Sequence, residues 1–378
     1  MIPITRVNLG EKEYKLVRET LLSGWVTQGP RVEEFERKFA GTIGAKYCVA
    51  VSSCTAGLFL SLHALGIGPG NEVIVPSFSF IATANSAVHC GATPVFVDID
   101  PATYNIGPAA IESAITGRTA AIIAVHQVGQ AADLDRIYEI AVRHGIPVVE
   151  DAACAIGTRY KGRPVGSEAE FACFSFHPRK IITTGEGGMV ATRSEKTAEK
   201  LKMLRNQGVS VSGLERHRSD RVVFEHYPVV GYNFRMTDIQ AAVGIAQLDS
   251  LGSLLKERSE LACRYSLAFS NHPVLQPPFV PEYSAHTFQT YLLRLKANCP
   301  LSRDELMQRL LDRGISTRRG VMCAHLEPCY AEIGRKTNLR HSEAAAEQTV
   351  ALPLYPGMTE GEQNTVISSV LELTTPKE

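Results

Sequence analysis

Two patterns of hydrophobic and polar positions alternate along residues 47–193. Short apolar runs, rich in β-branched residues and bounded by turn-forming residues, are separated by segments with apolar positions at helical spacing, such as 55–65 and 134–145. Continuous apolar strands between amphipathic helices are typical of a mainly parallel sheet that is covered by helices on both faces. The expected strands are residues 47–53, 71–77, 93–100, 119–125, 147–151, 170–176 and 187–193.

A different pattern follows a polar stretch that extends from about residue 208 to residue 227. A long helical pattern over 236–269 leads into a second, smaller region, where we expect a strand over 287–295 and helices over 301–314 and 359–373. The chain of 378 residues is long enough for two domains. We therefore predict an α/β fold with an N-terminal segment and a large domain with a seven-stranded, mainly parallel sheet over residues 1–250, and a smaller α+β domain over residues 251–378.

Composition excludes several classes of partner. Lysine and arginine together number 39, as do aspartate and glutamate, so no overall charge favours nucleic acid or a membrane surface. Charges within the first fifteen residues argue against a signal peptide, and no apolar run is long enough to span a bilayer. The nine cysteines lack metal-ligand spacing, and Cys48 and Cys173 lie inside apolar strands. We expect a cytoplasmic protein with reduced cysteines and no metal site.

Lys180 is the first candidate for chemistry. It lies in FSFHPRKIITTGEGG (174–188), between an apolar run and a segment with three glycines. A lysine in a dry pocket has a lowered pKa and a nucleophilic amine, as formation of a Schiff base requires. A lysine that merely ends a strand at the surface would have the same local sequence, so these residues alone leave both interpretations open.

Other strand ends carry groups that would complement this lysine. Ser53, Cys54 and Thr55 lie where a strand runs into a helix, which gives either an anion site or an ordinary helix cap. Asp151 follows a buried strand, where a carboxylate either forms a turn or holds a protonated ring nitrogen cationic. The 29 residues between Asp151 and Lys180 (180 − 151 = 29) leave room for a hairpin-like excursion and one further strand.

Two more residues belong to the same set. Ser175, five residues before Lys180 (180 − 175 = 5), offers a hydroxyl, and Phe80 follows a strand as either a stacking plate or a core residue. Ligands of parallel sheets bind at the carboxyl ends of the strands, where these groups converge. An anion cradle, a carboxylate, a lysine and an aromatic face are the parts that pyridoxal 5′-phosphate (PLP) requires.

The chain resembles the DegT/DnrJ/EryC1/StrS family of PLP-dependent sugar aminotransferases of fold type I. The resemblance extends from about residues 24–36 to residues 352–362, nearly the whole chain. Its most specific stretches are SSCTAGL, SFSFIATANSAVHCGATPVFVDID, HQVGQAADLD, VVEDAACAIG, FSFHPRKIITTGEGG and GYNFRMTDIQAA.

The resemblance implies a role for each candidate. Lys180 would form the Schiff base with PLP and move protons between the substrate carbon and the C4′ carbon, and Asp151 would pair with the pyridine nitrogen. The phosphate would be held by Thr55, the amide of Cys54 and Ser175, while Phe80 stacks on the ring. Asn233 would reach the phosphate from the neighbouring subunit, which implies a homodimer with shared active sites.

Three positions bear on how closely the family pattern applies. Family members often carry glutamine or histidine at the position of Cys154, near the 3′-hydroxyl of the cofactor, so we expect that contact to be weak or absent. Cys54 stands where glycine is frequent, and its backbone amide survives the change. Lys180 is retained, whereas a dehydratase branch has histidine there, so transamination is favoured.

The implied reaction transfers an amino group from L-glutamate to a keto sugar, and we expect this acceptor to be a nucleotide-linked 4-keto-6-deoxyhexose. A basic cluster in residues 208–226 either binds the nucleotide diphosphate across the dimer interface or forms a solvated loop. The cluster comprises Arg216, His217, Arg218, Arg221 and His226. His177 either faces the substrate or is structural. Alternatives are an aminotransferase of a keto-cyclitol or free keto sugar, and a regulatory protein that retains the fold without catalysis.

Overall fold

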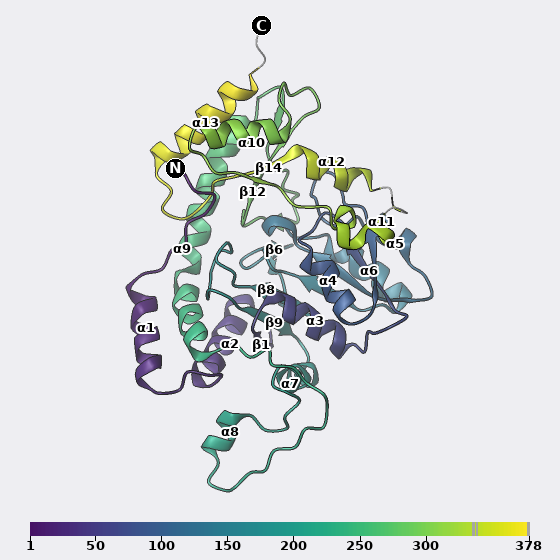
Figure 1. Cartoon of the computed structure of the whole chain (residues 1–378), viewed down its shortest axis with the longest axis vertical. Helices are drawn as coiled ribbons and strands as arrows, with labels where there is room; N and C mark the ends of the chain where they lie inside the picture. Colours follow the sequence, from purple (N-terminus) through teal and green to yellow (C-terminus); the bar gives the residue numbers. More distant parts are fainter. Residues whose placement is uncertain (335–336, 338, 376–378) are drawn as a thin grey trace.

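A computed structural model of the chain describes residues 1–334, 337 and 339–375. Its main feature is a seven-stranded sheet in the order β1-β9-β8-β5-β4-β2-β3 (Figure 1). The strands are β1 (Tyr47–Val51), β2 (Glu72–Pro76), β3 (Thr93–Val97), β4 (Thr119–Val125), β5 (Val148–Asp151), β8 (Ala172–Ser175) and β9 (Gly188–Thr192). Only β9 is antiparallel to its neighbours. The seven predicted strands and the mainly parallel sheet are confirmed.

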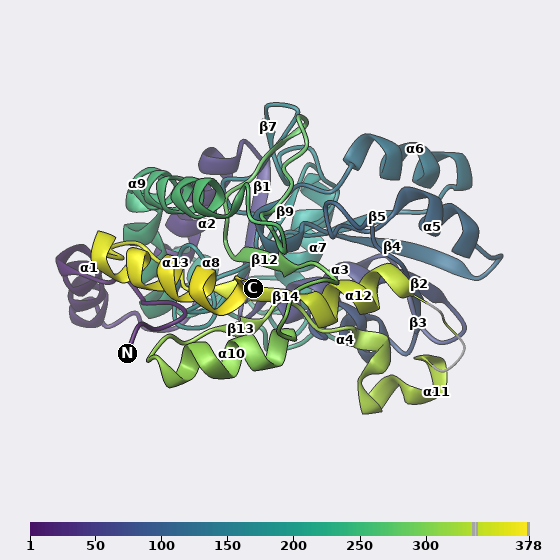
Figure 2. The same cartoon turned by 90° about the horizontal axis from the view of Figure 1, so that it is seen from above.

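Helices cover both faces of this sheet because the apolar side chains of its strands point to both sides. In β1, Val49 and Val51 pack with α3, whereas Cys48 and Ala50 pack on the opposite side. One face is covered by α3 (Cys54–Ala64), α4 (Ala82–His89) and α7 (Glu195–Leu204). The other is covered by α2 (Pro30–Ile43), α5 (Pro108–Ala114), α6 (Leu134–His144) and the first half of α9 (Asp238–Phe269). Figure 2 shows α5 and α6 on the side of β4 opposite to α4.

A hairpin interrupts the alternation of strands and helices between β5 and β8. It consists of β6 (Arg159–Tyr160) and β7 (Arg163–Pro164), and β11 (Ser284–Ala285) adds a third strand. The two turn residues, Lys161 and Gly162, have φ values of 46° and 80°. Positive φ at both positions is the geometry of tight hairpin turns. The excursion predicted between Asp151 and Lys180 is thus confirmed.

The C-terminal part has its own sheet, in the order β10-β12-β14-β13. Its elements are β10 (Leu275–Gln276), β12 (Tyr291–Leu295), α10 (Arg303–Asp312), β13 (Arg318–Arg319), α12 (Arg340–Gln348), β14 (Thr349–Leu352) and α13 (Glu360–Thr374). The 32-residue helix α9 serves both parts, since residues 241–254 pack beneath the large sheet and residues 261–269 pack in the small core. The predicted boundary at residue 250 falls inside this continuous helix, and the domain division stays a prediction.

The remaining elements lie at the periphery. They are α1 (Glu11–Leu22), α8 (Gly213–Arg218), α11 (Ala331–Gly334) and the short 3₁₀ turns Gln127–Gly129, Ala324–Leu326 and Pro328–Tyr330. Ile2 forms an isolated β-bridge with Ile315, so the start of the chain lies beside the C-terminal part. In Figure 1, α8 lies at the end of the molecule opposite to the C-terminus. Among the described residues, none of the helices is sufficiently long and apolar to cross a bilayer.

Candidate active site

Lys180 lies in the loop that connects β8 to β9. Backbone hydrogen bonds close this loop: the Phe176 amide donates to the Gly187 carbonyl (2.9 Å), and the Lys180 amide donates to the His177 carbonyl (2.8 Å). The Lys180 Nζ atom is 3.1 Å from the Sγ atom of Cys154, in the loop after β5. Both residues line a pocket with a volume of about 490 Å³ at the carboxyl end of the sheet. Lys180 is therefore not a solvated strand end.

The charge state of Lys180 differs from the sequence-based expectation. Burial lowers the pKa of its amine, but the Cys154 thiol, together with Cys54 and the Asp151 carboxylate, outweighs burial, and the net pKa is raised. The expected lowering of the Lys180 pKa is therefore wrong for the chain without its cofactor. The reason is that the amine lies near Cys154 and the Asp151 carboxylate, whereas the sequence pattern represented only burial.

Asp151 ends β5 and is 5% exposed. One carboxylate oxygen accepts from the Thr83 hydroxyl (2.8 Å), and the other accepts from the Ala153 amide (3.1 Å). Burial raises the pKa of the Asp151 carboxyl, while these two hydrogen bonds and the charges of Lys180 and His126 oppose that shift. A cation placed against the carboxylate would favour its charged form, as a protonated ring nitrogen does.

The N-terminus of α3 forms one wall of the pocket. The Ser53 hydroxyl caps the helix by accepting from the Ala56 amide (3.1 Å), which is the ordinary cap that the sequence allowed. Thr55 and Ser175 line the same pocket, where the first helical amides favour an anion. Burial raises the pKa of the Cys54 thiol, whose sulfur contacts the Cys173 carbonyl at 3.4 Å. Cys54 thus contributes its backbone rather than a reactive sulfur.

A glycine behind this wall shows how tightly the backbones meet. A Cβ atom at Gly188, the first residue of β9, would lie 2.5 Å from the Ser53 carbonyl carbon and 2.6 Å from the Cys54 nitrogen. These are backbone atoms, so a larger residue would have to move the start of α3. Gly188 therefore positions the anion-binding wall.

Phe80 also lines the pocket and is 59% exposed. The alternative that Phe80 is a core residue is therefore wrong, and its ring face is available to a planar ligand. Asn233 is exposed and lies outside the residues that line the pocket of this chain. Its backbone pairs with Asn206 instead.

The basic cluster of residues 208–226 lies away from the pocket, around α8. Arg216 pairs with Glu225 (2.8 Å), and Arg218 pairs with Glu33 (3.0 Å). His177 lines the pocket itself, where burial and the neighbouring Arg179 lower the pKa of its ring. The basic cluster and His177 were both candidates for contact with the substrate. Within one chain, only His177 lines the same pocket as Lys180.

Sequence reasoning missed several pocket residues. Thr83 holds Asp151 from the first turn of α4, and Arg179, Gln289 and Arg318 also line the pocket. Thr83 could have been found, because it follows Phe80 by three residues at the same strand end. Gln289 and Arg318 come from the C-terminal part, and no local pattern links them to Lys180.

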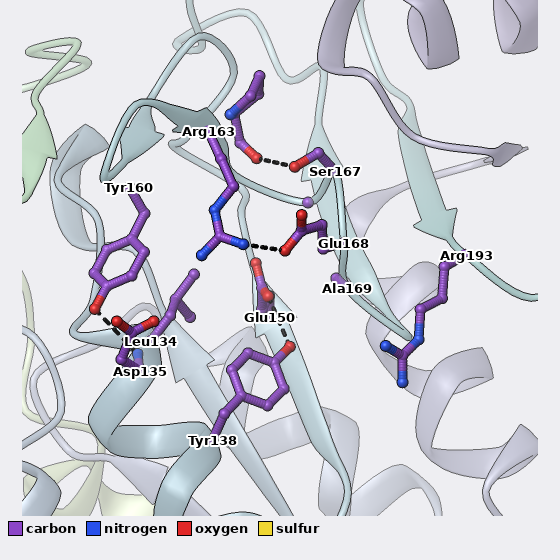
Figure 3. A pocket seen from close by; sticks show the side chains of 12 residues that line it. Leu134, Asp135, Tyr138, Glu150, Tyr160, Arg163, Ser167, Glu168, Ala169 and Arg193 are labelled. Carbon is purple, nitrogen blue, oxygen red and sulfur yellow. Dashed lines mark hydrogen bonds and ion pairs between the residues drawn. The ribbon is translucent and has the colours of Figure 1, made fainter.

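A second hollow, of about 250 Å³, lies beside the hairpin β6–β7 (Figure 3). Its charged groups are paired within the protein. Glu150 accepts from the Tyr138 hydroxyl (2.8 Å) and lies 3.1 Å from His126 Nε2, while Arg163 pairs with Glu168. Asp135, which also lines the hollow, pairs with Lys161 (2.6 Å). Among the residues shown in Figure 3, this hollow therefore has no unpaired charge that a ligand would neutralise.

The residues of the large pocket fit PLP. A helix N-terminus, the hydroxyls of Thr55 and Ser175, a buried carboxylate, an amine and an exposed aromatic ring surround one space of suitable volume. The absence of a side chain at Gly188 lets the start of α3 lie directly against β9 behind this site. This donor set matches a phosphate, a protonated ring nitrogen and an aldehyde.

Comparison with known proteins agrees with this assignment. The model of the DegT/DnrJ/EryC1/StrS aminotransferase family matches residues 7–371. The spore coat polysaccharide biosynthesis protein SpsC of Bacillus subtilis (strain 168) is 41% identical over 376 residues, which are 98% of this chain and 97% of that protein.

Solved structures of similar proteins have the same fold. DesV of S. venezuelae, in complex with a ketimine intermediate, is 36% identical with a TM-score of 0.89, over 97% of this chain and 95% of that one. The sugar aminotransferase Spr1654 of Streptococcus pneumoniae, in its PLP form, is 30% identical with a TM-score of 0.92, over 99% and 97% of the two chains. The chain thus belongs to the DegT/DnrJ/EryC1/StrS aminotransferase family and is a PLP-dependent transaminase of fold type I.

Proposed function

We propose that this enzyme transfers an amino group from L-glutamate to a nucleotide-linked 4-keto-6-deoxyhexose in amino-sugar biosynthesis. The observation that supports this most is that the Lys180 amine, the buried Asp151 carboxylate and the N-terminus of α3 line one pocket. Similar proteins with sugar-related names, SpsC and Spr1654, support a sugar as the acceptor. Bound PLP would supply an aldehyde that takes up the amino group and a ring that accepts electrons.

Each pocket residue has a defined task in this proposal. Asp151, fixed by Thr83, would stay ionised against the ring nitrogen, and Lys180 would accept and return the proton of the substrate carbon. Phe80 would stack on the ring. Thr55 and the Cys54 amide at the start of α3 would hold the phosphate, together with Ser175 at the end of β8. Cys154 lies beside the Lys180 amine, at the position where the family pattern expects a contact to the 3′-hydroxyl.

The active unit in this proposal is a homodimer. Asn233 is exposed and does not line the pocket of its own chain, which suits a residue that reaches the partner's phosphate. The neighbouring segment also exposes large apolar side chains, with Val222 84%, Phe224 78% and Val230 85% exposed. Side chains of this kind in one segment are typical of a surface that another chain covers.

Replacement of Lys180 tests its proposed role as the catalytic amine. Lys180→Ala should lose the yellow colour of the bound cofactor and reduce turnover by at least about 10³-fold, because the general base and the covalent link to the cofactor are both removed. Lys196→Ala, on the exposed face of α7, is the matched control. Turnover of Lys180→Ala at the control rate would refute the assignment. To identify the acceptor, the wild-type enzyme is incubated with glutamate and a panel of nucleotide-linked keto sugars and free keto-cyclitols. Mass spectrometry then shows which compound has gained an amino group.

The basic cluster supplies a second test. In the dimer, Arg216 and Arg218 would exchange their surface partners, Glu225 and Glu33, for the diphosphate of the acceptor. Replacing both arginines by alanine should raise the half-saturating concentration of the nucleotide sugar by roughly 10- to 100-fold and leave that of glutamate unchanged. If the value for the nucleotide sugar does not change, the cluster is a solvated loop and a free keto sugar becomes the better candidate.

A further inference from the structure

Two arginines in the active-site pocket have no acidic partner. Arg179 precedes Lys180, and Arg318 lies in β13 of the small sheet; within the described parts of the chain, neither forms an ion pair with a carboxylate. Arg319, next to Arg318, pairs with Glu327 at 3.3 Å. The contrast with the second hollow is direct, because Arg163 there pairs with Glu168 (Figure 3).

The two arginines line the same pocket, and the charge of one acts on the other. Burial, and then the charge of Arg318, lower the pKa of Arg179, while the Cys154 thiol opposes them. The same thiol contacts the Lys180 amine at 3.1 Å, so Arg179 and Lys180 share Cys154 as a neighbour. Two like charges brought together without an acid are unfavourable unless an anion joins them.

Both positions are fixed by the backbone. The Gln289 side chain donates to the Arg179 carbonyl (2.9 Å), and the Arg179 amide donates to His177 Nδ1 (3.2 Å). Arg318 pairs in register with Ala351 of β14. An anion bound between the two arginines would therefore connect the loop of the large sheet to the small sheet.

We propose that Arg179 and Arg318 bind the α-carboxylate of the amino-acid donor. This inference rests on the proposed function and names how its donor is recognised. The donor's α-carboxylate is attached to the same carbon as the amine that is transferred, so its site must lie beside Lys180, as Arg179 does. In a nucleotide-linked 4-keto hexose the diphosphate is attached across the sugar ring from the reacting carbon, so it lies a sugar's length away from Lys180. A planar guanidinium suits a carboxylate through two parallel hydrogen bonds.

The test uses the holoenzyme and the variants Arg179→Gln and Arg318→Gln, with Arg193→Gln as the control. Arg193 is 65% exposed, lies beside the second hollow and is paired with Glu170. Mixing with L-glutamate and following the absorbance of the cofactor gives the donor concentration for half-maximal conversion to the pyridoxamine form. We expect each variant to raise this concentration about 10- to 100-fold, because a hydrogen bond between a charged side chain and the carboxylate is lost. Calorimetry with glutarate, an unreactive dicarboxylate, should show a similar loss of affinity without any reaction.

The second half-reaction separates the possible failures. Starting from the pyridoxamine form, the half-saturating concentration of the keto sugar should be unchanged in both variants. If both variants match Arg193→Gln with glutamate and glutarate, or if only the keto-sugar value rises, the carboxylate assignment is overturned. If no amino acid converts even the wild-type enzyme, the proposed function fails, and glutarate affinity still decides whether the two arginines bind a carboxylate.

Discussion

At the scale of single residues, the contact between Cys154 and Lys180 opposes the effect of burial on the pKa of the catalytic amine. The thiol lies 3.1 Å from Nζ, and it raises the pKa of Lys180 against the effect of burial. Only the unprotonated amine attacks an aldehyde. Below the pKa of the amine, the unprotonated fraction grows tenfold for each pH unit.

Covalent loading of PLP onto the cofactor-free protein should therefore accelerate as pH rises from 7 to 9. In Cys154→Ala the opposing thiol is removed and burial dominates, so the Lys180 pKa falls and loading at pH 7.5 should become several-fold faster. Stopped-flow absorbance measures the rate at each pH. Cys90→Ala, a half-buried cysteine whose sulfur contacts the Phe59 carbonyl, is the control. Equal loading rates in Cys154→Ala and wild type would show that the thiol does not set the amine's charge.

At the scale of elements, the junction between β1 and α3 depends on the strand that lies behind it. β9 runs antiparallel to β1, with Gly188 opposite Val51. This register brings the Gly188 backbone against Ser53 and Cys54, where a Cβ atom would overlap backbone atoms. The anion wall is thus built by two strands and one helix together.

Gly188→Ala should displace the start of α3. We expect a loss of roughly 1–3 kcal/mol in the free energy of unfolding from overpacking, and about a tenfold weaker affinity for PLP because the first amides of the helix move. Denaturant unfolding and cofactor titration measure these two effects. Gly41→Ala, in α2 with no atom within 4 Å of its added Cβ, should instead stabilise the protein by about 0.5–1 kcal/mol. A Gly188→Ala variant with normal affinity would mean that the helix start tolerates the shift.

Elements also show what local patterns can predict. All seven strands of the large sheet were predicted because each is a continuous apolar run, and β12, α10 and α13 of the small part were predicted in the same way. The two-residue strands β10, β11 and β13 were not predicted, since a pair of residues such as Arg318–Arg319 carries no periodicity. These strands exist because longer neighbours offer them hydrogen bonds, as β14 does for β13.

At the scale of the whole molecule, buried polar contacts hold α9 to the C-terminal part and connect that part to the large sheet. Arg258 of α9 is 2% exposed and donates to the carbonyls of Phe288, Gln289 and Leu354 at 3.2–3.3 Å. Ser77, after β2, contacts His325 Nδ1. Ser77 is fully buried, so its hydroxyl cannot meet a substrate as a nucleophile would, and the contact is structural.

The exposed apolar segment carries the prediction of assembly. Val222→Ser combined with Phe224→Ser should raise the dissociation constant of the proposed dimer by roughly 100-fold, because both side chains would lose a buried partner. Activity and PLP affinity should fall at dilutions where the variant is monomeric, since Asn233 would no longer reach a partner. Sedimentation velocity over a range of concentrations measures the dissociation constant. Val142→Ser is the control, because Val142 is 79% exposed on α6, away from this segment. A wild-type monomer with full activity would contradict the proposed dimer.

The sequence by itself determined the strands of the large sheet, the helices α3, α6 and α9 on its faces and most of the chemistry at the strand ends. Lys180, Asp151, Thr55, Ser175 and Phe80 could be grouped in advance, because parallel strands place their carboxyl ends along one edge. The family resemblance also depends on these stretches alone.

Only the tertiary structure decided the charge of Lys180, the support of Asp151 by Thr83 and the presence of Arg318 beside Arg179. Charge interactions and hydrogen bonds depend on distances through space, and Arg318 is 138 residues away from Lys180 in the sequence (318 − 180 = 138). Hydrophobic periodicity reports which face of an element is buried, whereas it carries no information about which distant side chain shares a pocket.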